Sequence, residues 1–219
     1  MERTPCSYVS YGKVAEEERA GTGLMDYIAI VLLVMCLPLG KILPATIAWE
    51  NGPLEILQVL ILLAGAGLAC FFAKGNLRSM WSGVGGVFFL MIGRELSWGR
   101  VFFPTGVVEE TGPQFVAMRD IPGHLLIHAA IFAVIVGMII VLFKHTDFAA
   151  LRQIKFPTTT FLLCTLAFLL QLVSERHGFA GFTPPEAEII EEVAEVVCYG
   201  QAVYFVWYYG VRLRLLPQA

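Results

Sequence analysis

Charged residues are scarce in this sequence. Asp, Glu, Lys and Arg make up 15% of its 219 residues, whereas soluble domains average about 25%. Hydrophobic residues make up 57%, and the mean hydropathy is +0.71. A shortage of charge on this scale, together with long apolar runs, indicates a chain whose solvent is a lipid bilayer.

Several motifs are also missing. The five cysteines include no C-x-x-C pair, so we expect neither a structural disulfide nor a redox role. The sequence has no glycine-rich phosphate loop and no G-x-S-x-G nucleophile motif. It has no basic patch, and its net charge is -3, so nothing indicates nucleic-acid binding.

Six apolar runs follow one another along the chain. A helix that rises 1.5 Å per residue needs about 20 residues to cross about 30 Å of hydrocarbon, and each run has close to that length. We therefore predict an all-α polytopic membrane protein of about six transmembrane helices, forming one bundle domain over residues 1–219. Residues 1–25 are predicted to be a cytoplasmic segment, and residues 99–121 an outer loop without a long helix. The runs are Tyr27–Leu43, Leu54–Ala73, Met80–Trp98, Pro122–Phe143, Phe156–Val173 and Val193–Val211.

The basic residues sort to one side of this topology. Positive charge favours the cytoplasmic side, so the bias predicts that both termini are cytoplasmic. Ten Lys and Arg residues fall on the predicted inner side: Arg3, Lys13, Arg19, Lys74, Arg78, Lys144, Arg152, Lys155, Arg212 and Arg214. Five fall on the outer side: Lys41, Arg94, Arg100, Arg119 and Arg176. We expect a multi-pass protein of the cell inner (plasma) membrane.

Acidic residues gather before the last apolar run. Thr183–Glu186 has the pattern of a capping box with proline in the first turn, so the last helix should begin about ten residues outside the hydrocarbon. A stripe of four glutamates follows at helical spacing, and like charges at that spacing repel one another. The stripe is therefore either a solvated face or part of a site. Its members are Glu188, Glu191, Glu192 and Glu195.

Two further groups lie at the outer ends of their runs. Glu95 needs a partner, which Arg94, Arg100, a histidine or a metal could provide. His124 and His128 stand four residues apart and offer two nitrogens on one helical face, as a zinc site requires, although interhelical hydrogen bonds are an alternative role. We predict a site for Zn²⁺ or another divalent metal, with metal ligands His124, His128 and Glu191. The predicted catalytic residues are Glu95, Glu195 and His177.

Four features together resemble a family of uncharacterised bacterial multi-pass membrane proteins with an E-x-S-W-G motif at the end of a transmembrane helix. They are the stretch WENGPLEILQVL, the stretch GRELSWGR, a histidine entering the fourth run and an acidic start to the last. The resemblance implies an architecture and a candidate site rather than a reaction. Arg94 stands where the family commonly has an acid, and Arg100 where it has Gln. The H-x-x-x-H pattern is also similar to membrane hydrolases of the alkaline ceramidase type, whose order of serine, aspartate and histidine is not reproduced here.

These observations lead to one expected function and two alternatives. The first is an outward-facing, metal-dependent hydrolase or lipid-modifying enzyme, in which a zinc-bound water supplies hydroxide at neutral pH. The second is a small cation- or proton-coupled transporter. The third is a non-catalytic assembly subunit whose glutamates bind a basic partner. We expect the bilayer itself, and a lipid or membrane-embedded substrate, as partners.

Overall fold

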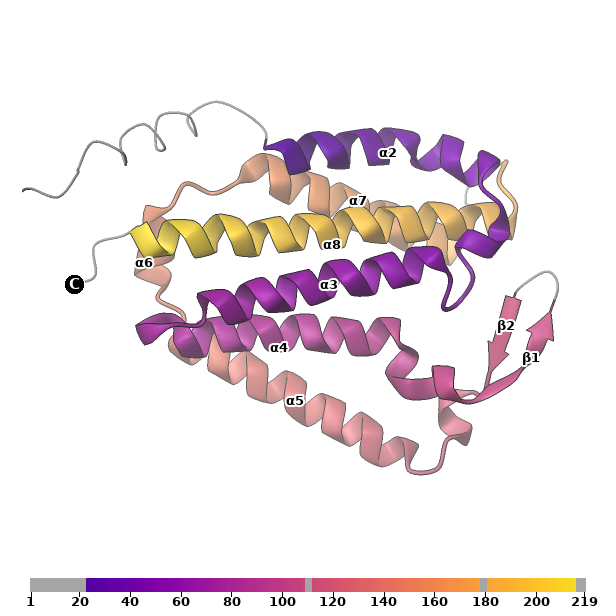
Figure 1. Cartoon of the computed structure of the whole chain (residues 1–219), viewed down its shortest axis with the longest axis horizontal. Helices are drawn as coiled ribbons and strands as arrows, with labels where there is room; N and C mark the ends of the chain where they lie inside the picture. Colours follow the sequence, from indigo (N-terminus) through magenta and orange to yellow (C-terminus); the bar gives the residue numbers. More distant parts are fainter. Residues whose placement is uncertain (1–22, 109–111, 178–180, 216–219) are drawn as a thin grey trace, which may run out of the picture.

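A computed structural model describes residues 23–108, 112–177 and 181–215. Within them the chain is a bundle of six long helices that run alternately up and down (Figure 1). The long helices are α2 (Leu24–Ile42), α3 (Pro53–Phe72), α4 (Arg78–Glu95), α5 (His124–His145), α7 (Thr158–His177) and α8 (Pro184–Leu215). The short helix α6 (Phe148–Gln153) joins α5 to α7. The predicted all-helical character is thereby confirmed in its main features.

Four of the helices, α2, α3, α5 and α7, are long and apolar enough to cross a membrane. The other two long helices, α4 and α8, each bury one carboxylate inside the bundle, Glu95 and Glu195. Helix α8 packs against α2, α3 and α7, and fourteen of its residues are buried. Because a central helix touches protein instead of lipid, its composition need not be uniformly apolar.

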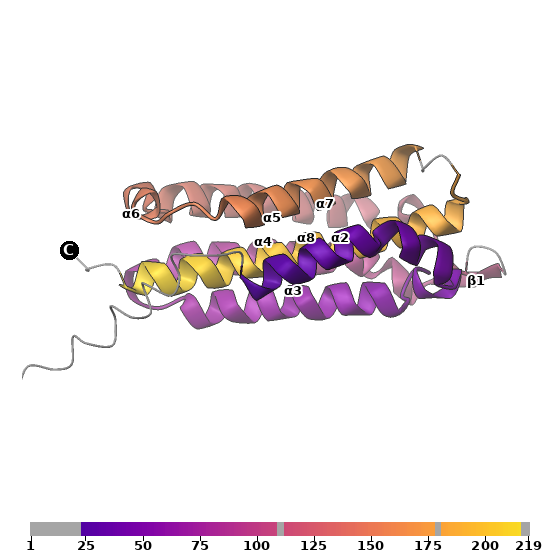
Figure 2. The same ribbon diagram turned by 90° about the horizontal axis from the view of Figure 1, so that it is seen from above.

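The helices form layers. Figure 2 shows α5, α6 and α7 on one side of α8 and α4, and α3 on the opposite side. Helix α3 packs against both α4 and α8, whereas α5 packs mainly against α4 and has no buried residue. The α3–α4 and α3–α8 contacts are close because two glycines admit aromatic rings: Gly65 faces Phe88, and Gly210 faces Phe72.

Helix boundaries follow local chemistry. Pro53 begins α3, where its missing N–H leaves no hydrogen bond unmade. The Thr183 N–H donates to Glu186 Oε2 at 2.6 Å, as the predicted capping box requires. One expectation needs correction, because the fourth run was predicted from Pro122 but α5 begins at His124, after Gly123 in a left-handed conformation. Pro38 lies inside α2 without ending it.

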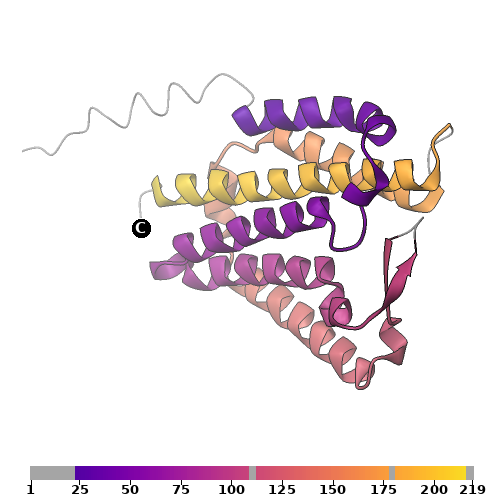
Figure 3. The same ribbon diagram turned by 45° about the vertical axis from the view of Figure 1, so that its right-hand side comes forward.

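The predicted outer loop, residues 99–121, contains a β-hairpin that the sequence analysis did not anticipate. Strands β1 (Pro104–Val108) and β2 (Gly112–Phe115) pair antiparallel, and short 3-10 helices flank them: η3 (Ser97–Phe102) and η4 (Met118–Asp120). The hairpin projects from the end of the bundle at which α8 begins (Figure 3). The Pro and Gly residues of this segment correctly predicted that it forms no long helix, but they are equally compatible with a short hairpin.

The motif GRELSWGR reverses the chain at the end of α4. Ser97, Trp98 and Gly99 all have positive φ angles, of 45°, 52° and 88°. The Trp98 ring folds back over Gly93, where a Cβ would come within 2.5 Å of the ring. Two consecutive non-glycine residues in this conformation are unusual and mark a strongly constrained turn.

Candidate functional site: a buried cluster of carboxylates around one arginine

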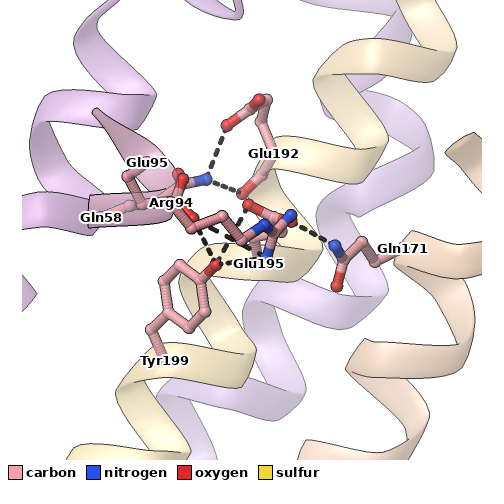
Figure 4. Close-up of polar contacts among 7 residues, drawn as sticks. All are labelled: Gln58, Arg94, Glu95, Gln171, Glu192, Glu195 and Tyr199. Carbon is pink, nitrogen blue, oxygen red and sulfur yellow. Dashed lines mark hydrogen bonds and ion pairs between the residues drawn. The ribbon is translucent and has the colours of Figure 1, made fainter. Parts of the chain in front are cut away.

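Polar side chains from four helices meet near the end of α4 (Figure 4). Helix α3 contributes one residue, α4 two, α7 one and α8 three. In chain order they are Gln58, Arg94, Glu95, Gln171, Glu192, Glu195 and Tyr199. We call this set the carboxylate cluster. Helical spacing accounts for the α8 members, because Glu192, Glu195 and Tyr199 are separated by three and four residues.

Arg94 and Glu195 form the central ion pair. One Arg94 nitrogen lies 2.6 Å from Glu195 Oε1, and another donates to the Tyr199 hydroxyl oxygen at 2.9 Å. Gln171 Nε2 also donates to Glu195 Oε1. Glu195 therefore has a cation and an amide donor, and these charge-assisted hydrogen bonds offset part of the cost of burying its carboxylate.

Glu95 is less well compensated. Its Oε1 accepts a hydrogen bond from the Tyr199 hydroxyl at 2.7 Å, and its distance from the Arg94 guanidinium is 3.8 Å. The same hydroxyl lies 3.5 Å from Glu195 Oε2. Tyr199 thus stands between two carboxylates, close enough to donate to either.

Glu192 interacts with a neutral partner. Gln58 Nε2 donates to Glu192 Oε2 at 2.6 Å and to the Glu192 main-chain carbonyl at 3.1 Å. Gln58 is fully buried, and its Oε1 has no hydrogen-bond donor in the described part of the chain. An unsatisfied buried acceptor costs about 1–3 kcal/mol, so this oxygen is suited to accept a hydrogen bond from a further donor.

The charges in the carboxylate cluster do not balance. The cluster contains three carboxylates and one guanidinium. The two carboxylates next to the guanidinium are almost completely buried, with Glu95 6% exposed and Glu195 3% exposed. The Arg94 side chain itself is 56% exposed. Since an unpaired charge is very costly away from water, such a cluster favours an additional positive charge or proton.

Two ion pairs lie nearer the end of the bundle. Lys41 Nζ is 2.6 Å from Glu186 Oε2, and this hydrogen bond lowers the pKa of the Glu186 carboxyl. Arg100 lies 2.5 Å from Glu50 Oε1, which also accepts from Ser97 Oγ at 3.0 Å. Arg100, one of the partners proposed for Glu95, is therefore engaged elsewhere.

The predicted metal ligands are not assembled. His124 and His128 lie at the start of α5, which diverges from the rest of the bundle toward that end (Figures 1 and 3). His128 is exposed, its Nδ1 is 2.8 Å from the His124 carbonyl oxygen, and Glu191 is half-buried on α8. No group of three or more His, Cys, Asp or Glu residues that could hold a metal occurs in the described ranges. The divalent-metal site stays a prediction, which element analysis of protein purified without chelator tests.

Of the predicted catalytic residues, the structure brings Glu95 and Glu195 together through Arg94 and Tyr199. His177 ends α7, and its side chain lies outside the described part of the structure. Sequence reasoning placed the two glutamates at one level because both stand at the outer ends of their runs. It named Arg94 as a possible partner of Glu95, but it did not identify Tyr199 as the residue between the two glutamates.

Three members of the cluster were missed: Gln58, Gln171 and Tyr199. Each had a signal in the sequence. Gln58 is one of few polar residues in the second run, Gln171 is similarly isolated in the fifth, and Tyr199 follows Glu195 by four residues, on the same helical face. Polar side chains within an apolar run usually face the interior of a bundle, and this rule would have pointed to all three.

An apolar cavity of about 380 Å³ lies at the other end of the bundle. Helices α4, α5, α6 and α8 line it, with Met80, Trp81, Leu142, Leu151, Val206 and Leu213 among its residues. Among the α4 residues that line the cavity, Val84 lies closest to Arg94. The two are ten residues apart along the helix, which corresponds to about 15 Å. This cavity is therefore separate from the carboxylate cluster, and it does not form a substrate pocket for Glu95 or Glu195.

The chain matches no protein-family model, no curated protein and no solved structure. The resemblance to bacterial multi-pass membrane proteins thus continues to depend on the quoted motifs alone. Any functional conclusion has to come from the geometry of the carboxylate cluster.

Proposed function

We propose that this chain is a membrane transport protein that moves protons and that the carboxylate cluster is its proton-binding site. The observation that carries the proposal is the charge imbalance: two almost completely buried carboxylates, Glu95 and Glu195, share the single guanidinium of Arg94. A buried site with more carboxylates than cations lowers its energy by taking up a proton. Intramembrane carboxylates are characteristic of proton pathways in pumps and transporters.

Glu95 is the proton carrier in this proposal, and Glu195 is the counter-ion of Arg94. When Glu95 is ionised, the Tyr199 hydroxyl donates to it at 2.7 Å. When Glu95 takes up a proton, its new O–H donates to the Tyr199 oxygen, and the Tyr199 hydroxyl hydrogen turns toward Glu195 Oε2, which is 3.5 Å away. Rotation of one hydroxyl therefore accommodates both protonation states without moving a helix.

The geometry favours this function over the metal-dependent hydrolase. A hydrolase of the expected type needs His124 and His128 beside the carboxylates. Both histidines lie at the start of α5, which packs mainly against α4 and diverges there from the other helices. A proton-binding site needs only the groups that Figure 4 shows in contact. The assembly-subunit alternative gives no reason to bury the glutamates.

The membrane arrangement belongs to the same proposal. All six long helices cross the bilayer, both termini are cytoplasmic, and the protein resides in the cell inner membrane. The two helices whose composition alone does not indicate a crossing, α4 and α8, lie alongside α3, which can cross by its own composition. The carboxylate cluster then opens toward the outer side.

We predict that a fluorescent protein fused to the C-terminus is fluorescent in cells and that a phosphatase fused at the same position is inactive. The reason is the excess of Lys and Arg in the segments at that end of the bundle, which holds them in the cytoplasm. The reverse pattern of reporter activity would invert the topology and place the carboxylate cluster toward the cytoplasm.

The transport proposal is tested in vesicles that contain the purified full chain and a pH-sensitive dye. We predict that the wild-type protein dissipates an imposed pH gradient faster than empty vesicles do, and that Glu95→Gln reduces the rate to the empty-vesicle level. Glu186→Gln is the matched control, because Glu186 pairs with Lys41 at the rim of the bundle. A Glu95→Gln protein that is as fast as the wild type excludes Glu95 as the carrier.

A further inference from the structure

We propose that Asp26 is a second proton-binding carboxylate, which exchanges protons with the carboxylate cluster along the contact between α7 and α8. This inference rests on the proposed function and extends it from binding at one end of the bundle to a route into its interior. The route begins at Glu95, passes Tyr199 and Glu195 and then Cys164 and Cys198, and ends at Gln201 and Asp26.

Asp26 is a buried acid for which the described ranges provide no cation. It is 3% exposed; Thr160 Oγ1 donates to its Oδ1 at 2.9 Å, and the Gly23 N–H donates to its Oδ2 at 3.2 Å. Both partners are neutral. Among the residues that the structure describes, no Lys, Arg or His lies within 4.0 Å of its carboxylate. Asp26 lies in the first turn of α2, where the helix dipole stabilises a carboxylate. The dipole does not explain why the side chain is buried.

Asp26 lies at mid-depth in the bundle. Gln201 Nε2 donates to the main-chain carbonyl of Met25 at 3.1 Å, which places the start of α2 beside the middle of α8. Along α8, Gln201 is six residues from Glu195 and eleven residues from Arg212, or about 9 Å and about 16 Å of helical rise. Asp26 therefore lies level with the middle of the longer helix α8, between the carboxylate cluster and the basic residues at the end of α8.

A second observation points to a ligand at this level. Gln201 is 2% exposed, and its Oε1 accepts no hydrogen bond in the described part of the chain. Its amide stands beside the residue that precedes Asp26. An acceptor left open in this way suits a protonated carboxyl or a proton-carrying water, because either would supply the missing donor.

Separate polar contacts lie along the α7–α8 contact between the two carboxylate sites. Gln171 bonds Glu195. Two turns away along α7, and three residues farther along α8, the thiols of Cys164 and Cys198 lie 3.6 Å apart. The α7 positions that face this contact are Gln171, Ala167, Cys164 and Thr160, at spacings of three and four residues. Ala167 is fully buried and packs with Ala29 and Val197, so a short apolar cluster separates the polar groups of this stripe, and a proton has to cross it.

The groups that would influence a proton on Asp26 come from the two helices packed against α2. Helix α7 presents Thr160 and, one turn on, Cys164, while α8 presents Cys198, Gln201 and Tyr204, whose ring lies against Gly23. The transfer itself is balanced: Glu95 loses a proton, the Asp26 carboxylate gains it, and the charge of each site changes by one unit. No oxidant or other reactant takes part.

The test uses the same vesicle assay, with wild-type protein, Asp26→Asn and the control Asp120→Asn, whose parent side chain is 61% exposed in the outer loop. We expect proton flux to fall to the empty-vesicle level in Asp26→Asn and to remain at the wild-type rate in Asp120→Asn. Gln201→Leu, which keeps both carboxylates, should slow the flux. If Asp26→Asn does not fold, Asp26→Glu, which preserves a carboxyl, replaces it and should retain part of the flux, whereas Gln201→Leu should still be slower than the wild type.

The outcomes separate the two proposals. Wild-type flux that neither Asp26→Asn nor Gln201→Leu reduces would overturn the route through Asp26 and leave Glu95 as the carrier. Flux that follows a sodium gradient in place of a proton gradient would also overturn the proton route. Absence of flux from the wild type would refute the proposed function, and the route with it.

Discussion

Replacement of Arg94 by alanine is expected to destabilise the folded protein by about 3 kcal/mol, because Glu195 would be left buried without its cation. Glu195 is 3% exposed. Its other donors in the described part of the chain are the Gln171 amide and the more distant Tyr199 hydroxyl. We place the effect at the low end of the range for buried pairs, since the Arg94 side chain is 56% exposed. Thermal unfolding in detergent, compared with the wild type, measures the loss.

Two further variants make this prediction specific. Arg119→Ala removes an arginine whose side chain is 85% exposed, and it should change stability by less than about 0.5 kcal/mol. The double variant Arg94→Ala/Glu195→Gln removes both charges and should recover part of the stability lost in Arg94→Ala alone. Equal stability of Arg94→Ala and the wild type would show that the Arg94–Glu195 pair does not hold the bundle together.

Gly65→Ala is expected to cost about 1–3 kcal/mol, the usual effect of overpacking a closely packed interface. A Cβ at this position would come within 2.4 Å of the Phe88 ring, which is 3% exposed and held in the main core cluster. The contact joins α3 to α4, and α4 carries Arg94 and Glu95. We therefore expect Gly65→Ala to lower both the unfolding temperature and the rate of proton flux.

Gly67 offers a matched control two residues along the same helix. Its position is exposed, and a Cβ there would meet nothing within 4 Å. Alanine at this site should leave stability unchanged or raise it by up to about 1 kcal/mol, because alanine restricts the unfolded chain and favours the helix. Similar losses for both variants would mean that helix propensity, and not the close approach of α3 to α4, governs the effect.

The long helices were predictable because bilayer thickness and helical rise restrict apolar runs to a narrow range of lengths. The starts of two helices were also predictable, because Pro53 and Thr183 act through contacts within their own helix turn. Lateral packing was not predictable. His124 and Glu95 both stand at the outer ends of their apolar runs, yet α5 diverges from α8 in the structure. The sequence of one helix does not determine which other helices pack against it.

The site was predictable in part for a related reason. Glu95 and Glu195 attracted attention because carboxylates are costly near hydrocarbon. Gln58 and Gln171 are neutral and therefore less conspicuous, and Tyr199 looks like an interfacial aromatic. Their roles depend on which side chains of neighbouring helices they contact. Those contacts are set by how α3, α4, α7 and α8 pack together. A polar residue becomes informative only after its partner helix is known.

The most direct test of the proton-binding proposal is the infrared spectrum of the purified protein, recorded as the difference between high and low pH. We predict that the wild type shows the carbonyl stretching band of a buried protonated carboxyl, that Glu95→Gln lacks this component, and that Glu186→Gln retains it. An identical band in wild type and Glu95→Gln would contradict the claim that the carboxylate cluster holds its exchangeable proton on Glu95.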